Sequence, residues 1–171
     1  MQTQSQRSKT RLQRVLERVG STIQQDFAIL TCGLVNDPNV GMIVRTANAF
    51  GVKEVLVLGS DSWIKSKACQ TEKFTRIKHF KTPETVLAYI FANEYNLVCV
   101  EQTPSSVDLR KVVYPAKPVF ALGNESIGMD GVIQNFAKIS VEIPMIGATP
   151  SLNVAVSAGI VMFDYFSKAN K

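Results

Sequence analysis

The chain has 171 residues, 46% of them apolar, which is enough to bury one sizeable core in a single domain. No apolar run reaches the roughly 20 residues that a bilayer span needs, and the polar, basic N-terminus lacks the apolar segment of a signal peptide, so we expect a cytoplasmic protein without a membrane partner. The three cysteines are widely spaced and there is one histidine, so we expect neither a metal site nor a disulfide framework.

The net charge of +5 is concentrated in the first 25 residues, where five basic side chains accompany a single acid, Glu17. Those basic side chains are Arg7, Lys9, Arg11, Arg14 and Arg18. Apolar residues recur at helical spacing from Thr10 to Val19, which predicts an amphipathic basic helix. Such an arm is typical of RNA binding, because Lys and Arg displace counterions from phosphates; a solvated helix that keeps the protein soluble is the alternative. We therefore divide the chain into an arm, residues 1–25, and a domain, residues 26–171.

Apolar runs of strand length alternate with helical segments along the domain. Strands are predicted at residues 27–35, 54–59, 97–100, 119–122 and 139–143. Helices are predicted at residues 41–50, 83–93, 129–136 and 152–167. The last helix carries on one face Leu152, Ala155, Val156, Gly159, Ile160 and Phe163. Near-continuous apolar strands that alternate with helices indicate an α/β fold with a parallel sheet covered on both faces.

Three polar blocks follow predicted strands. They are NVGMIVRTANAFG at residues 39–51, LGNESIG at 122–128 and IPMIGATPSLNV at 143–154. Ligands of parallel α/β sheets bind beyond the carboxyl ends of the strands, and these ends meet at one edge of the sheet. We therefore expect the three blocks to form a single site.

Several common chemistries lack their motifs. No GxGxxG follows the first strand, which argues against a dinucleotide-binding dehydrogenase and the common Rossmann-type methyltransferase. No GxxxxGK[ST] is present for an NTPase; GNESIG has the GxxxxG spacing but continues with Met129 and Asp130. No GxSxG elbow is present, and His79 lies in a basic stretch, KFTRIKHFK, without an evident serine partner, so a hydrolase is not supported.

In this order and spacing the three blocks resemble the SpoU (TrmH-like) group of SPOUT RNA methyltransferases, over about residues 27–166. TrmH-type tRNA methyltransferases also begin with a basic helix before the first strand. The resemblance implies a parallel-sheet SPOUT fold with a C-terminal trefoil knot, S-adenosylmethionine bound in that knot, and a homodimer. It implies methyl transfer to a ribose 2′-hydroxyl of RNA, an in-line displacement that needs alignment of the reactants and no metal.

The resemblance also implies polar site residues. Arg45 matches the family's catalytic arginine, with Asn39 from the same block. A guanidinium stays protonated, so we expect it to orient a phosphate or stabilise an oxyanion rather than accept a proton; a surface arginine is the alternative. Glu125 matches the glutamate of the second block, and Ser151 and Asn153 match the serine and asparagine of the third. Helix capping is the alternative for Ser151 and Asn153.

Cofactor contacts in this family come largely from the backbone. The matching positions are Leu122, Gly123, Ile143, Met145 and Leu152. For the aliphatic members core packing is the alternative, while a glycine at 123 lets a ligand approach the main chain closely. Glu101, which begins the loop after the strand at 97–100, is expected to contact the nucleoside.

The RNA target is less constrained. An arm without a separate RNA-binding module resembles the tRNA guanosine enzymes and favours tRNA, whereas the end of the chain at Lys171, short of the longer tail of TrmH proteins that modify the tRNA D-loop, weakens that preference. Methylation of rRNA and a catalytically silent RNA-binding member of the fold are the alternatives, and a base-methylating relative would lack this combination of arginine and SLN.

Overall fold

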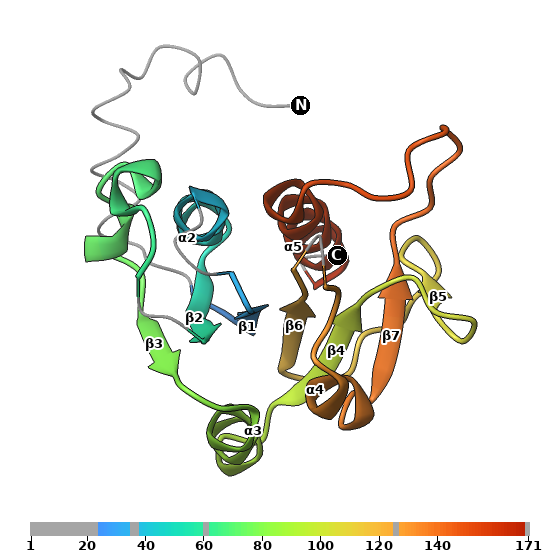
Figure 1. Ribbon diagram of the computed structural model, residues 1–171, viewed down its shortest axis with the longest axis horizontal. Helices are drawn as coiled ribbons and strands as arrows, with labels where there is room; N and C mark the ends of the chain where they lie inside the picture. Colours follow the sequence, from blue (N-terminus) through green and yellow to red (C-terminus); the bar gives the residue numbers. More distant parts are fainter. Residues whose placement is uncertain (1–23, 35–37, 60–61, 125–126, 170–171) are drawn as a thin grey trace, which may run out of the picture.

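The computed structural model describes residues 24–34, 38–59, 62–124 and 127–169 (Figure 1). The helix predicted within the arm and Glu125 of the second block lie outside the described residues. So do the basic residues Arg7, Lys9, Arg11, Arg14 and Arg18.

One sheet of seven parallel strands forms the centre of the molecule, in the order β3-β2-β1-β6-β4-β7-β5. The strands are β1 (Gln25–Cys32), β2 (Val52–Leu58), β3 (Ile77–Phe80), β4 (Asn96–Val100), β5 (Val107–Asp108), β6 (Pro118–Leu122) and β7 (Ile139–Glu142). The predicted parallel sheet is confirmed. The two strands that were not predicted, β3 and β5, are its edges.

Helices cover both faces of this sheet, as predicted. They are α2 (Pro38–Ala49), α3 (Pro83–Ala92), α4 (Gly131–Asn135) and α5 (Val154–Ala169), with two short 3-10 turns, η2 (Lys65–Ala68) and η3 (Thr71–Lys73). Figure 1 shows α2 and α5 side by side on one face, and α3 and α4 on the other. None of the helices within the described residues is long and apolar enough to cross a membrane.

Alternation along the central strands divides the core in two. Phe27 and Ile29 of β1 point to the side of α2 and α5, while Ala28 and Leu30 point to the side of α3 and α4. All four side chains are fully buried. Because both faces of the sheet are covered, β4 and β6 are apolar at nearly every position, and polar residues gather in the loops at the carboxyl edge.

The last helix buries a different face from the apolar one that its spacing predicts. Its buried residues are Val154, Ala158, Val161 and Met162. Val156 and Phe163 of the predicted face are 51% and 60% exposed. The helix is apolar on most sides, so periodicity alone does not select the side that meets the sheet. An apolar strip on α5 therefore faces outward.

Candidate active site

A hollow with an empty volume of about 670 Å³ opens at the carboxyl ends of β4, β6 and β7. It is lined by Val100, Glu101, Gln102, Leu122, Gly123, Asn124, Gly128, Val141, Glu142, Ile143, Met145, Ser151, Leu152, Val154 and Ser157. We call it the edge pocket. All six positions that the sequence suggested for contact with the cofactor or its nucleoside line it.

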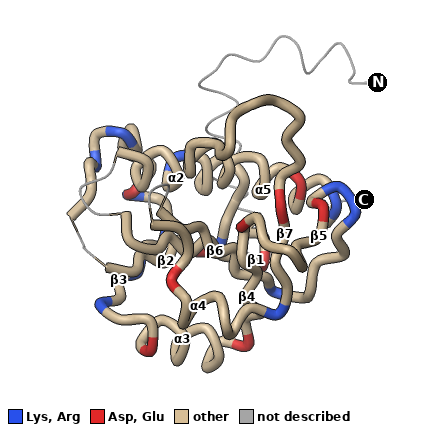
Figure 2. The backbone as a smooth tube through the Cα atoms, turned by 45° about the vertical axis from the view of Figure 1, so that its right-hand side comes forward, with Lys and Arg blue, Asp and Glu red and all other residues tan. Residues whose placement is uncertain are grey.

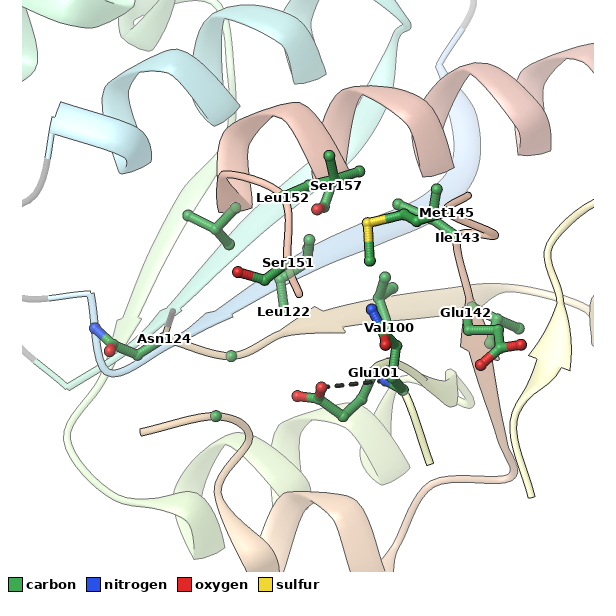
Figure 3. Close-up of a pocket in the computed structure, with 15 residues that line it drawn as sticks. Val100, Glu101, Leu122, Asn124, Glu142, Ile143, Met145, Ser151, Leu152 and Ser157 are labelled. Atoms are coloured by element: carbon green, nitrogen blue, oxygen red, sulfur yellow. Dashed lines mark hydrogen bonds between the residues drawn. The ribbon is translucent and has the colours of Figure 1, made fainter. Parts of the chain in front are cut away.

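The walls of the edge pocket come from the loops that follow three strands. Figure 3 shows Met145 and Glu101 reaching into the hollow from opposite sides, with Ser151 near its centre. The Oε1 of Glu101 accepts a hydrogen bond from the backbone N–H of Gln102 at 3.1 Å, and Gln102 Nε2 donates to the carbonyl oxygen of Pro150 at 3.4 Å. The loop after β4 is thereby linked to the segment that leads into α5.

Close packing of the main chain requires a glycine at position 123. A Cβ at this position would lie 2.5 Å from the carbonyl carbon and oxygen of Gly128. The backbone of Asn124 exchanges two hydrogen bonds with that of Gly128, of 3.1 Å and 2.8 Å, which folds the second block back on itself. The close approach that we had expected from a ligand is thus made by the main chain at residue 128, because the turn returns against the end of β6.

One side chain joins the first block to the third. Asn153 lies immediately before α5, and its Oδ1 accepts hydrogen bonds from the backbone N–H groups of Ala155 and Val156 at 3.0 and 3.2 Å. Its Nδ2 donates to Oδ1 of Asn39 at 3.0 Å. Asn153 therefore caps the helix and also positions Asn39, which is only 9% exposed in the first turn of α2. Capping does not involve Ser151, whose side chain lines the edge pocket instead.

Arg45 is separate from the edge pocket. It is exposed on α2, and its Nη1 donates to Sγ of Cys69 at 3.4 Å. A Cβ on Gly41 would lie 2.7 Å from the carbonyl oxygen of Ile64 and 2.8 Å from Cβ of Lys67, so a glycine there lets η2 pack directly on α2. Gly41 of the first block therefore helps to place Cys69 beside Arg45. No sequence motif indicated this contact.

A second hollow lies beside the edge pocket, at the carboxyl ends of β1 and β2. It is lined by Cys32, Gly33, Leu58, Gly59, Lys81, Pro83, Ile127, Gly128, Met129 and Asp130. Gly128 lines both hollows. Burial raises the pKa of Cys32 far above its usual value and that of Cys99 to about 12, so both thiols are protonated at neutral pH. Both cysteines are free and buried. The described residues hold no group of three or more His, Cys, Asp or Glu that could bind a metal.

The sequence also held signals for pocket residues that we did not predict. Gly128 ends the second block, and its φ of +73° allows the return of the chain against Gly123. Ser157 lies three residues after Val154 on α5, so helical spacing directs both toward the same hollow. Gln102 had no such signal, because its contact with Pro150 joins residues far apart in the chain.

Comparison with known proteins identifies related sequences. The model of the SpoU rRNA Methylase family matches residues 26–163. A tRNA (guanosine(18)-2'-O)-methyltransferase from Aquifex aeolicus is 30% identical over 158 residues, covering 90% of this chain and 73% of that protein. A mouse protein of the same activity name is 31% identical over 157 residues, but the chain spans only 10% of its length.

Solved structures share the fold. The A. aeolicus TrmH/SpoU tRNA modifying enzyme superposes with a TM-score of 0.80 and 25% identity, over 93% of this chain and 84% of that one. An rRNA methyltransferase from Sinorhizobium meliloti, crystallised with AdoMet bound, gives a TM-score of 0.75 and 25% identity over 85% of this chain and 57% of that one. The parallel α/β architecture is therefore that of SPOUT methyltransferases.

Proposed function

Because the chain belongs to the SpoU rRNA Methylase family, we propose that it is an RNA methyltransferase that modifies a ribose 2′-hydroxyl of tRNA, with guanosine as the nucleoside. The observation that carries this proposal is the edge pocket, whose walls include residues of the second and third blocks. The third block is in turn joined to the first by the Asn153–Asn39 hydrogen bond. The activity names of the Aquifex and mouse relatives support tRNA as the substrate.

The residues of the edge pocket fit S-adenosylmethionine. Leu122, Ile143, Met145 and Leu152 offer apolar surface for an adenine ring, and the Glu101 carboxylate is an acceptor suited to ribose hydroxyls. The sulfonium of this cofactor supplies an electrophilic methyl group with a good leaving group. In support, the S. meliloti relative carries AdoMet in its crystal structure.

The polar residues of the three blocks have distinct roles in this proposal. Arg45 offers a cation with several N–H donors, so it orients a phosphate or stabilises the negative charge that develops on the 2′-oxygen as it attacks the methyl carbon. Asn39, held by Asn153, and Ser151 orient the ribose. Glu125 completes the set from the second block. In this proposal the 2′-hydroxyl proton passes to water rather than to Arg45, and S-adenosylhomocysteine is the leaving group.

We also propose that the protein is a homodimer that uses the face formed by α2 and α5. Met42, Val156 and Phe163 on this face are 38%, 51% and 60% exposed, and Ile146 in the segment before α5 is fully exposed. A second copy is the occupant that the family resemblance implies, and large apolar side chains in one surface are characteristic of such interfaces. Met42 precedes Arg45 by three residues on α2, so a partner there would also shield the catalytic arginine.

Three further expectations belong to the same proposal. Residues 1–25 form an arm that binds RNA through its five basic side chains. The segment from β6 to α5 carries the trefoil knot; in support, β6 lies between β1 and β4, the chain continues to β7, and α5 then returns to pack on α2. The enzyme acts in the cytoplasm, where tRNA is available.

The decisive experiment is to supply isotopically labelled S-adenosylmethionine with total tRNA or with rRNA, digest the product to nucleosides, and identify the labelled one by mass. A 2′-O-methyl product also resists alkaline cleavage at its 3′ phosphate. Label in rRNA alone would reassign the substrate, label on a base would reassign the reaction, and no label in either RNA would favour a catalytically silent RNA-binding protein.

The same assay tests Arg45. Arg45→Ala should lower the transfer rate by at least about 100-fold, the size of effect seen when one oxyanion donor is removed, while S-adenosylmethionine still binds. Arg110→Ala is the matched control, because Arg110 is exposed at the far edge of the sheet and pairs with Asp108 at 2.6 Å. Near-normal transfer by the Arg45 variant would remove this residue from the catalytic set.

A further inference from the structure

The segment from Lys65 to Lys81 is the most basic part of the described domain. It carries six basic side chains against a single acid, Glu72. The basic residues are Lys65, Lys67, Lys73, Arg76, Lys78 and Lys81. The near-neutral total charge of the domain conceals this concentration, because acidic residues are in excess over the remainder of residues 26–171.

Most of this charge is not neutralised by the protein. In the parts of the chain that the structure describes, no carboxylate pairs with Lys65, Lys67, Lys73 or Lys81, and all four are exposed. Arg76 alone forms an ion pair, 3.3 Å from Glu54, and its side chain is still 59% exposed. Figure 2 shows the blue positions gathered along the loop that follows β2, next to a blue position on α2.

An exposed aromatic ring lies within this basic segment. Phe74 is 73% exposed, and among the described residues it has no aromatic partner. Its backbone is nevertheless held firmly. Thr75 is buried and its Oγ1 donates to the carbonyl oxygen of Thr71 at 3.0 Å, while Thr71 Oγ1 donates to that of Ala68 at 2.6 Å. A solvent-exposed ring on a backbone held in this way, between cations, suits stacking by a nucleic-acid base.

Two parts of the segment reach the candidate site. Near its start Cys69, the residue after η2, accepts the hydrogen bond from Arg45. At the other end Lys81 lines the second hollow, which shares Gly128 with the edge pocket. A polynucleotide that lies along the segment would therefore arrive at Arg45 and at the second hollow, beside the edge pocket.

We propose that residues 65–81 form an RNA-docking surface, on which Phe74 stacks with an unpaired base and the lysines bind the flanking phosphates. This inference rests on the proposed function for the identity of the polyanion, and it adds to the arm a second contact within the folded domain. RNA is favoured over an anionic membrane because the surface offers one aromatic ring among cations, rather than the broad apolar face that membrane insertion needs.

The first test measures binding of the full chain to an unmodified tRNA transcript by fluorescence anisotropy, without S-adenosylmethionine. Phe74→Ala should raise Kd by between about 5-fold and 150-fold, the range for loss of one base stack, and Phe74→Trp should bind as well as the native protein. Phe91→Ala is the control, since Phe91 is 53% exposed on α3 and packs against Phe136 instead. Native-like binding by Phe74→Ala would overturn the proposal.

The second test uses salt. Replacing Lys65, Lys67 and Lys73 together by alanine should reduce the slope of log K against log [KCl] by about 2, since each contact with a single-stranded phosphate contributes about 0.7. Replacing Lys117 and Lys138, which pair with Glu94 and Asn96, should leave the slope unchanged. An unaltered slope in the triple variant, or a loss of binding to phosphatidylserine vesicles but not to tRNA, would overturn the proposal.

These measurements separate the two proposals. Binding does not require methyl transfer, so weakened tRNA binding by the Phe74 and lysine variants supports the docking surface even if the native protein methylates no RNA. The opposite result is also informative. If the native protein methylates tRNA and these variants bind tRNA normally, the docking surface is wrong and the proposed function stands.

Discussion

At the scale of single residues, Asn153 shows why a capping residue and a site residue are hard to tell apart. Its Oδ1 accepts from two backbone N–H groups at the start of α5, and its Nδ2 donates to Asn39. The cap holds the amide in place, and the remaining donor is thereby aimed at the first block. Asparagine, unlike an ionised aspartate, supplies both an acceptor and a donor, and they are separate atoms of one side chain.

Two substitutions at this position separate the roles. Asn153→Ala removes the cap and should lower the free energy of unfolding by about 1 kcal/mol. The rate of methyl transfer should fall as well. Asn153→Asp keeps the capping oxygen and adds a favourable negative charge at a helix N-terminus, so urea unfolding should show native stability. If Asn153 positions Asn39, transfer by the aspartate variant will still be impaired at least tenfold. Full activity in Asn153→Asp would mean that the residue is a cap alone.

At the scale of elements, the sequence predicted best where burial on both sides makes a strand continuously apolar. The runs at 54–59 and 97–100 match β2 and β4 to within two residues. The edge strand β3 escaped prediction because charged and aromatic residues follow one another in IKHF, and an edge strand needs little burial. For α5 the element was predicted, but its spacing did not identify the buried side, because a helix that is apolar on most sides has no single preferred face.

A substitution in the turn of the second block tests whether this turn shapes the edge pocket. Gly123→Ala places a Cβ 2.5 Å from the backbone of Gly128, and that backbone cannot move without breaking the two hydrogen bonds to Asn124. We expect the variant to fold but to lose most of its affinity for S-adenosylmethionine in calorimetry. Gly131→Ala is the control, because a Cβ there meets nothing within 4 Å. Equal affinities of the two variants would show that the turn does not shape the pocket.

A polar cluster links β2 to α3 away from the site. The carboxylate of Glu54, 1% exposed, accepts hydrogen bonds from the hydroxyls of Tyr89 and Tyr95 at 2.9 Å and pairs with Arg76. Burial, and then the hydrogen bond to Glu54, raise the pKa of Tyr89 to about 12. The folded protein therefore prefers the neutral phenol more strongly than the unfolded chain does.

This difference predicts how stability changes with pH. The contribution of Tyr89 is complete below the unfolded pKa of about 10 and is lost as pH rises toward 12. Tyr89→Phe should cost about 1.5 kcal/mol in urea unfolding at pH 8, because a hydrogen bond to a charged acceptor is removed. Between pH 10 and 12 its stability should fall less steeply than that of the native protein. Parallel curves over that interval would contradict the role given to this pair.

At the scale of the whole molecule, the convergence of three separated blocks at one edge of the sheet was predictable, because parallel strands bring their carboxyl ends together. The neighbourhood of Arg45 was not. Its contact with Cys69 depends on η2 packing against Gly41, and no periodicity connects these residues. The basic surface at residues 65–81 was likewise hidden by a charge count over the entire domain.

From the exposed apolar face of α2 and α5 we predict that the protein is a homodimer. A protomer has a mass of 18.8 kDa, so sedimentation at micromolar concentration should give about twice that value. Phe163→Asp should shift the protein to the monomer, because an unpaired carboxylate would be buried at the centre of the apolar strip. Phe136 follows α4 at the opposite face and is similarly exposed at 54%, so Phe136→Asp should remain dimeric. A native protein that sediments as a monomer would refute the dimer. If Phe163→Asp is still a dimer, the interface lies away from α5 and the second copy does not cover the apolar strip.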